Sequence, residues 1–135
     1  MAKQVILSDE NCIGQLDAIF NELERLDLVE LLEIELRTWE QIGLKKGADD
    51  EIVWHFCQEN HYLLVTSNRT GSDGNKSLEH TIRRLVTPTS LPVLTIGNPK
   101  RVTRDRKYCI ACAQRLADIV FELEKYLGVT RLYLT

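Results

Sequence analysis

The chain has 135 residues, of which 44% are hydrophobic and 27% charged, with only 7 Gly and 3 Pro. That length fits one domain, and the composition excludes disordered, collagen-like and low-complexity chains. No apolar run approaches the roughly 20 residues that cross a bilayer, and the first residues do not resemble a signal peptide. We therefore expect a single domain over residues 1–135, located in the cytoplasm and making no use of a membrane.

The net charge of −3 hides an uneven distribution along the chain. Residues 1–68 contain 14 Asp and Glu against 5 Lys and Arg, a net charge of −9, whereas residues 69–135 contain 6 against 12, a net charge of +6. Such asymmetry is typical of an acidic site beside a basic binding face. It also fits two halves that pack together and intermix their charges on the surface.

The first half of the chain opens with a strand and continues with helices. Residues 5–7 form a short β-branched apolar run that predicts a buried strand, with Asp9 just after its carboxyl end. Apolar residues then recur at spacings of three and four from Gly14 to about Leu36, which predicts two helices or one long bent helix. Residues 36–39 suggest a short strand, and the acidic residues 49–51 suit the start of a helix that runs to Asn60.

The second half repeats the alternation of strands and helices. The apolar run of residues 62–65 predicts a strand, and Ser77 is a candidate cap for a short helix that ends before Pro88. Residues 91–96 predict a third strand. A long amphipathic helix ending at Gly128 precedes a terminal strand at residues 131–134.

Helices that alternate with short, continuously apolar strands predict crossover connections and a mainly parallel sheet covered on both faces. The expected fold class is therefore α/β, a three-layer α/β/α sandwich. In open sheets of this kind, ligands bind outside the carboxyl ends of the strands, near the point where the strand order reverses.

Three polar groups follow predicted strands or begin a helix, which is where that rule locates a site. They are residues 9–11 (Asp, Glu and Asn), residues 49–51 (Asp, Asp and Glu) and Asn68. Mg²⁺ and Mn²⁺ prefer oxygen ligands and need one or two carboxylates together with water and substrate phosphate, so the pattern fits phosphodiester chemistry. A solvated turn at Asp9 and a simple helix cap at Asp49 or Asp50 are the structural alternatives.

Three segments of the chain, in order and spacing, resemble the PIN-like proteins of the bacterial DUF5615 type. These segments are residues 5–11 (VILSDEN), 39–52 (WEQIGLKKGADDEI) and 64–69 (LVTSNR). The resemblance implies a Rossmann-like PIN fold, an acidic site for Mg²⁺ or Mn²⁺, and hydrolysis of single-stranded RNA. Many such proteins are the toxin half of a toxin–antitoxin pair, so an antitoxin or another protein partner is also implied.

The resemblance assigns roles to individual residues. Asp9 matches the first aspartate of the family, and either Asp49 or Asp50 matches the acid that opens the central helix. Asn68 replaces the aspartate expected after the next strand, and an amide brings no charge to a cation. Asp73 or Glu79 is a candidate replacement for that acid. Without it, the alternative is a catalytically inactive module that binds RNA or a partner protein.

A basic segment follows the third predicted strand, with five cations in residues 100–107. Cations of this kind give affinity for nucleic acid that is independent of sequence and sensitive to salt. The residues that we expect to bind substrate are Asn11, Arg69, Lys100, Arg101 and Arg104. The alternative is a solvated loop, since no aromatic residues lie among the cations for base stacking.

The remaining features predict structural roles or self-association. The four cysteines, including the C-x-x-C pair Cys109 and Cys112, are expected to be structural thiols, with redox regulation as the less favoured alternative. Trp39 and Trp54 are expected to pack in the core. Residues 16–36 contain more leucine than one helix face needs, which suggests a homodimer unless a second layer covers them.

Overall fold

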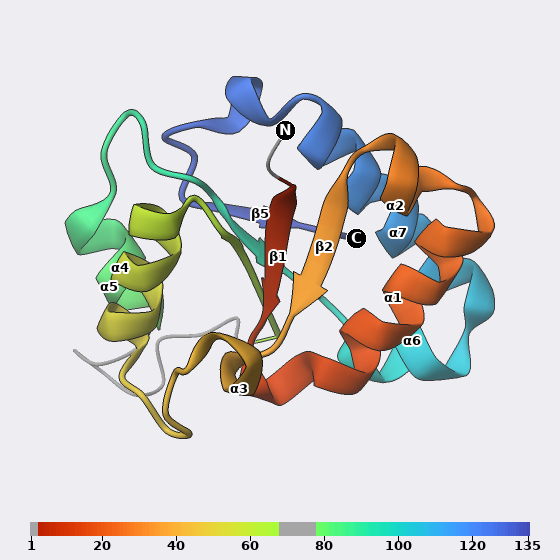
Figure 1. Ribbon diagram of the computed structural model, residues 1–135, viewed down its shortest axis with the longest axis horizontal. Helices are drawn as coiled ribbons and strands as arrows, with labels where there is room; N and C mark the ends of the chain where they lie inside the picture. Colours follow the sequence, from red (N-terminus) through yellow and green to blue (C-terminus); the bar gives the residue numbers. More distant parts are fainter. Residues whose placement is uncertain (1–2, 68–77) are drawn as a thin grey trace.

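The computed structural model describes residues 3–67 and 78–135, and for residues 78–80 it describes the backbone alone. Its helices and strands alternate along the chain (Figure 1). The first half contains β1 (Gln4–Ser8), the 3₁₀ turn η1 (Glu10–Cys12), α1 (Ile13–Arg25), α2 (Leu28–Leu31), β2 (Ile34–Arg37), α3 (Trp39–Ile42) and α4 (Asp50–Asn60). The second half contains β3 (Leu63–Thr66), α5 (Leu78–Leu85), β4 (Val93–Thr95), α6 (Pro99–Arg104), α7 (Arg106–Phe121), η3 (Leu123–Tyr126) and β5 (Arg131–Tyr133).

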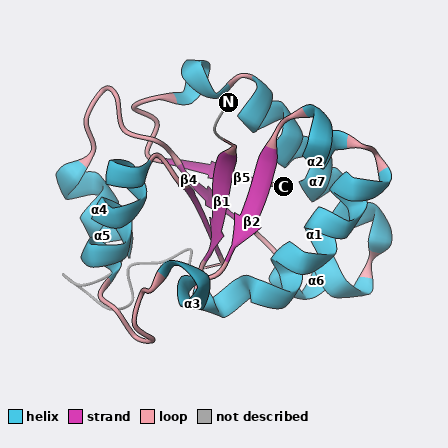
Figure 2. Ribbon diagram, in the orientation of Figure 1, coloured by secondary structure: helices cyan, strands magenta, loops and turns pink. Residues whose placement is uncertain are grey.

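The five strands form one sheet in the order β2-β1-β3-β4-β5, and every neighbouring pair is parallel. Helices cover both faces of this sheet, with α1, α6 and α7 on one side and α4 and α5 on the other (Figure 2). The expected α/β class and three-layer architecture are therefore confirmed. The strand order reverses between β1 and β3, which locates the switch point of the sheet there.

Each face of the sheet has its own hydrophobic core. On the side of α1 and α7, Ile6, Leu63 and Leu94 pack with the inner faces of these helices. On the side of α4 and α5, a smaller core contains both tryptophans, as the sequence predicted, and the full set is Leu7, Trp39, Val53, Trp54, Cys57, Leu64, Ile82 and Val93. Strands that are apolar along their whole length are the consequence of this covering on two faces.

The crossovers do not all have the same hand. The β1–β2 crossover passes over the face of α1 and moves toward one edge of the sheet, whereas the β4–β5 crossover passes over the same face and moves toward the other edge. Because all strands are parallel, these two crossovers have opposite hands. The second crossover contains the helices α6 and α7. Helix α7 packs against α1, so the chain passes over the face of α1 before it reaches the edge strand β5.

Several boundaries differ from those predicted by the sequence. The last long helix was expected to end at Gly128, but α7 ends at Phe121 and the 3₁₀ turn η3 follows it. The predicted helical region ended near Leu36 with a strand from there to Trp39, but helix α2 ends at Leu31, β2 occupies Ile34–Arg37 and Trp39 begins α3. The basic segment is helical, not a loop, because the Asn98 side chain caps α6 and Pro99 occupies its first turn. Among the described residues, no helix is long and apolar enough to cross a membrane.

Candidate functional site

The carboxyl ends of β1 and β3 lie side by side at the switch point, and Asp9 lies between them. Its backbone N–H donates to the carbonyl of Val65 at 2.9 Å, which ties the end of β1 to the end of β3. The chain then turns into η1, and the Asp9 side chain caps that turn. The location of Asp9 after the first strand agrees with the sequence prediction.

Both carboxylate oxygens of Asp9 accept hydrogen bonds. Oδ1 accepts from the backbone N–H of Glu10 at 2.8 Å, and Oδ2 accepts from the hydroxyl of Thr66 at 2.7 Å. Burial raises the pKa of Asp9 above its usual value, and the nearby Glu10 carboxylate adds to the rise, while the bonds from Thr66 and Glu10 partly offset it. Asp9 is therefore a largely desolvated carboxylate with fixed geometry.

Two buried thiols lie close to Asp9. The Cys12 Sγ donates to the carbonyl of Val65 at 3.4 Å, and desolvation raises the pKa of Cys12 and of Cys57 to about 12 each, with the charge of Asp9 adding to both. Burial also raises the pKa of Cys109 and of Cys112. All four thiols are free, buried and held protonated, as expected for structural cysteines.

Glu10 and Asn11 fasten neighbouring loops to the site. The Glu10 Oε1 accepts from the backbone N–H of Gly47 at 2.8 Å, and the Asn11 Oδ1 accepts from the backbone N–H of Ser67 at 3.2 Å. Asn11 was expected to bind substrate, and in the structure it is hydrogen-bonded to Ser67, the residue directly after β3.

The predicted acids Asp49 and Asp50 lie at the start of α4. Asp49 is the N-cap residue, but its side chain makes no capping hydrogen bond, and it is exposed at a surface hollow on the outer face of α4. Asp50 is the first residue of the helix and is partly buried. The remaining predicted residues Asn68, Arg69 and Asp73, with the side chain of Glu79 and the predicted cap Ser77, lie outside the described residues.

Among the described side chains, those of residues 3–67 and 81–135, no three of His, Cys, Asp or Glu come together as a group that could hold a metal ion. A magnesium ion in a phosphate-binding site needs only one or two carboxylates, because water and substrate oxygens complete its six ligands. The described donors thus fit a site of that kind centred on Asp9, and they do not form a cage of protein ligands alone.

A cavity of about 470 Å³ adjoins this edge of the sheet. Its apolar wall is made by Ile13, Trp39 and Leu44, and Glu10 lies at its border with the site. The indole Nε1 of Trp39 is buried and has no hydrogen-bond partner among the described residues. The edge therefore offers an apolar hollow beside the desolvated carboxylate.

A second feature lies where α6 meets α7, after the carboxyl end of β4. We call it the basic corner and define it as Lys100, Arg104 and Lys107, which are all exposed. No ion pair of these three side chains occurs within the described part of the chain. They are available to an anionic ligand.

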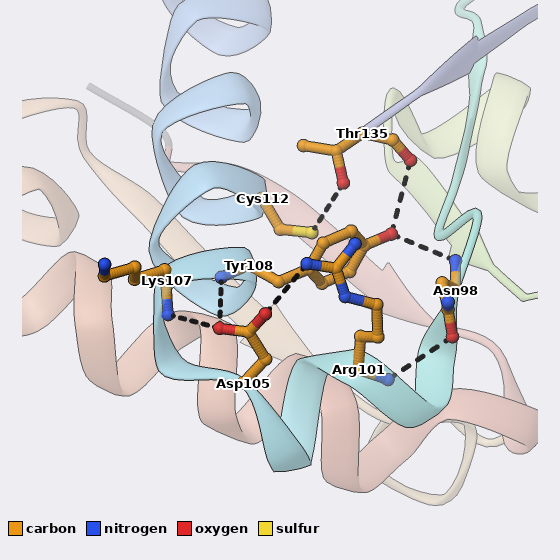
Figure 3. A network of polar contacts seen from close by, with 7 residues as sticks. All are labelled: Asn98, Arg101, Asp105, Lys107, Tyr108, Cys112 and Thr135. Carbon is orange, nitrogen blue, oxygen red and sulfur yellow. Dashed lines mark hydrogen bonds and ion pairs between the residues drawn. The ribbon is translucent and has the colours of Figure 1, made fainter.

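Arg101, also predicted to bind substrate, is built into a local network (Figure 3). Its Nη2 lies 2.8 Å from the Asp105 Oδ2, and its guanidinium stacks 4.5 Å from the centre of the Tyr108 ring. The Tyr108 hydroxyl accepts from the backbone N–H of Asn98 at 3.0 Å and donates to the carbonyl of Thr135 at 3.3 Å. This network holds the start of α6 against the end of β5 and so fixes the basic corner.

Thr66 and Tyr108 are the important residues that the sequence prediction missed. The predicted strand ended at Val65, one residue too early, and extending it would have brought Thr66 level with Asp9 at the sheet edge. Tyr108 gave no sequence signal beyond its place beside the cations.

Comparison of the chain with protein-family models, curated proteins and solved structures found no match.

Proposed function

We propose that this chain is a PIN-like protein that binds single-stranded RNA at the carboxyl edge of its sheet and hydrolyses it with Mg²⁺ or Mn²⁺. The proposal rests mainly on Asp9, a desolvated carboxylate held by Thr66 and by the N–H of Glu10 at the β1–β3 switch point. Parallel α/β sheets bind ligands at this point. A divalent cation there would compensate the cost of keeping a buried carboxylate charged.

The metal, when bound, would activate a water molecule and neutralise charge on the phosphate. The residues of the chain would orient the Asp9 carboxylate and bind the RNA. Thr66 fixes the Oδ2 of Asp9, Asn11 is hydrogen-bonded to Ser67 directly after β3, and the basic corner supplies cations to the sugar–phosphate backbone. Asp49 or Asp50 and Asn68 complete the site in this proposal, with Asp73 or Glu79 as the further acid and Arg69 as a further phosphate ligand.

The resemblance to PIN-like proteins also suggests a biological setting. An enzyme that cleaves RNA is harmful to its own cell unless it is restrained, so we include in the proposal a cytoplasmic toxin that a protein antitoxin inhibits. The PIN-like class and this setting rest on residues 5–11, 39–52 and 64–69 of the sequence.

A second candidate function is an RNA-binding module without catalysis. Its support is that both Asp9 oxygens already accept hydrogen bonds and that the described residues contain no group of three donors. In this case the basic corner binds RNA and the carboxyl edge holds no metal.

Thermal unfolding with and without divalent cations distinguishes the two functions. A cation that binds only the folded protein stabilises it by about 2.7 kcal/mol at a concentration 100 times its Kd. We expect millimolar Mn²⁺ to raise the Tm of the wild type by several degrees and to leave the Tm of Asp9→Asn unchanged. Asp118→Asn is the matched control, because it removes an exposed carboxylate on α7 and should respond like the wild type.

Cleavage of a labelled single-stranded RNA completes the test. The nuclease proposal predicts cleavage that requires Mn²⁺ or Mg²⁺, stops with a chelator and is lost in Asp9→Asn. Cleavage that persists in Asp9→Asn or in the chelator would contradict this site. Binding of the RNA with no Tm response to either cation would favour the module without catalysis.

A further inference from the structure

A groove lies between α1 and β2, far from the basic corner in the sequence. Two hollows of about 620 Å³ and about 580 Å³ form it, and they share Lys3, Glu24 and Val29 among their lining residues. Helix α1 forms one wall through Phe20 and Glu24, and β2 forms part of the other through Leu36. Because the two hollows share residues, they are neighbours, and we call the pair the groove.

The groove is strongly acidic. Its lining includes the carboxylates of Asp17, Glu24, Asp27, Glu30 and Glu33. Within the described part of the chain, these five side chains form no ion pair or side-chain hydrogen bond. Lys3 is the cation that lines both hollows, so the surface has a negative charge that a cationic ligand would neutralise.

The groove also borders an open edge of the sheet. Strand β2 is the first strand in the sheet order, and among the described strands it pairs with β1 alone; it lies at one edge of the sheet in Figure 2. The carbonyl of Glu33 accepts from the N–H of Gln4, so it points toward β1. Since backbone polar groups alternate in direction along a strand, those of Ile34 and Leu36 point away from β1, toward the open edge.

Two leucines beside the acidic groups are exposed. Leu31 has 75% of its surface accessible and Leu26 has 47%. They belong to α2 and to the turn after α1. The surface around the groove therefore combines carboxylates, apolar side chains and backbone groups of β2 that pair with no other described strand.

We infer that this groove binds an extended segment of a partner protein, with lysine or arginine alternating with apolar residues, as an added strand on β2. The N–H and C=O groups of Ile34 and Leu36 pair with the backbone of the segment, as in other cases of strand addition. Because α1 and α2 lie on the same face of the sheet, the cations of the segment lie on that face and meet the carboxylates of Glu24 and Glu30, while its apolar side chains lie on the other face.

The charge of the groove selects this occupant over two others. A second copy that paired β2 with β2 would bring the two sets of carboxylates together, and like charges oppose association. RNA is repelled for the same reason. The negative charge of the groove attracts a basic segment, whereas it repels a second copy of the groove and RNA.

The test uses an acetylated and amidated octapeptide of alternating lysine and valine, titrated into the full chain by calorimetry at low salt. We expect saturable binding with one site. The double variant Glu24→Gln, Glu30→Gln removes two of the attractive charges and should weaken binding by about three- to tenfold, since exposed ion pairs contribute modestly. The control Glu59→Gln, Glu124→Gln removes two exposed charges elsewhere and should bind like the wild type.

Methylation of the peptide backbone tests the strand pairing itself. Two further peptides are N-methylated, one at every valine and the other at every lysine. Only one set of N–H groups faces β2, because the register links the side-chain face to the direction of the N–H. One methylated peptide should therefore lose binding while the other retains it.

Three results would overturn the inference. The first is no binding of the unmodified peptide at millimolar concentration. The second is equal weakening by the groove variant and by its control, which would indicate attraction to net charge alone. The third is equal binding of both methylated peptides, which would show that β2 accepts no added strand.

Discussion

The Asp9 side chain is held in one geometry by hydrogen bonds, but keeping its carboxylate charged costs free energy because it is desolvated. Its carboxylate accepts two short hydrogen bonds, but it is surrounded by β-strand ends and by the buried thiols of Cys12 and Cys57. The pKa remains raised because desolvation outweighs these bonds. The sequence predicted the position of this residue, since an acid after a buried strand is a local pattern. Its partner Thr66 lies 57 residues away in the chain, and this contact depends on the pairing of β1 with β3.

The raised pKa of Asp9 predicts how stability changes with pH. Between the ordinary pKa of an aspartate and the raised value, the folded protein binds more protons at this group than the unfolded chain. The contribution of Asp9 to the free energy of unfolding therefore falls as pH rises through that interval. We expect the Tm of Asp9→Asn, measured without divalent cations, to improve relative to the wild type from pH 4 to pH 7 by a few degrees. A constant Tm difference across this range would contradict the raised pKa.

Thr66 is the second residue whose effect can be measured. The substitution Thr66→Val keeps the shape of the side chain and removes the donor to the Asp9 Oδ2. We expect a loss of about 1–3 kcal/mol in the free energy of unfolding, as for hydrogen bonds to charged groups, and a further rise in the pKa of Asp9. Denaturant unfolding measures the first and an NMR titration of the carboxyl carbon the second. Thr66→Ser should keep the pKa near that of the wild type.

At the scale of elements, the strands and the central helix were predictable because their patterns are local. The apolar runs before Asp9 and before Thr66 became β1 and β3, and the acids of residues 49–51 do begin α4. The end of the first helical region was not predictable. The chain turns with Asp27 and Glu33 in the left-handed conformation, at φ 59° and 53°. Glycine usually marks such turns, and the sequence has none there.

Two glycines give opposite predictions for the same substitution. Gly128 has φ +84°, and an added Cβ would lie 2.9 Å from the carbonyl oxygen of Pro88. Gly128→Ala should therefore lower the free energy of unfolding by about 1–3 kcal/mol, through both the strained φ and the contact. Gly14 lies in the first turn of α1 with nothing near its Cβ position, so Gly14→Ala should raise stability by about 0.4–1 kcal/mol.

Denaturant unfolding of the two variants side by side checks this pair. Each is the control of the other, because the same methyl group is added to a helix in one case and to a left-handed turn in the other. Equal effects would show that the loop between η3 and β5 tolerates a side chain at residue 128.

At the scale of the whole molecule, the charge asymmetry of the sequence becomes two separate surfaces. Ion pairs such as Arg106–Glu22 and Arg84–Glu51 do join the two halves, so part of the charge intermixes. The carboxylates of the groove lie on α1, α2 and the adjoining turns, whereas the basic corner lies on α6 and α7. The sequence indicated both charges. The sequence could not show which cations form contacts within the protein, as Arg101 does with Asp105 and Tyr108. Those contacts depend on how α6 packs in the folded chain.

The division of the basic segment leads to a prediction about RNA binding. Replacing Lys100, Arg104 and Lys107 together by glutamine removes the three cations of the basic corner. If each contacts one phosphate of a single strand, the slope of log K against log salt should become smaller by about 2, since each contact contributes roughly 0.7. The affinity should fall for every RNA sequence alike, because phosphate contacts do not read bases. Fluorescence anisotropy with labelled oligonucleotides of different sequence, at several salt concentrations, measures both.

The control replaces the same number of cations elsewhere, as Arg25→Gln, Arg115→Gln and Lys125→Gln. Both triple variants change the net charge by the same amount, so a general attraction between RNA and protein charge would weaken both equally. A specific basic corner weakens the first alone. If the first variant still binds RNA and the salt slope is unchanged, the RNA interface does not include α6 and α7. RNA would then reach the carboxyl edge around Asp9 without contacting the basic corner.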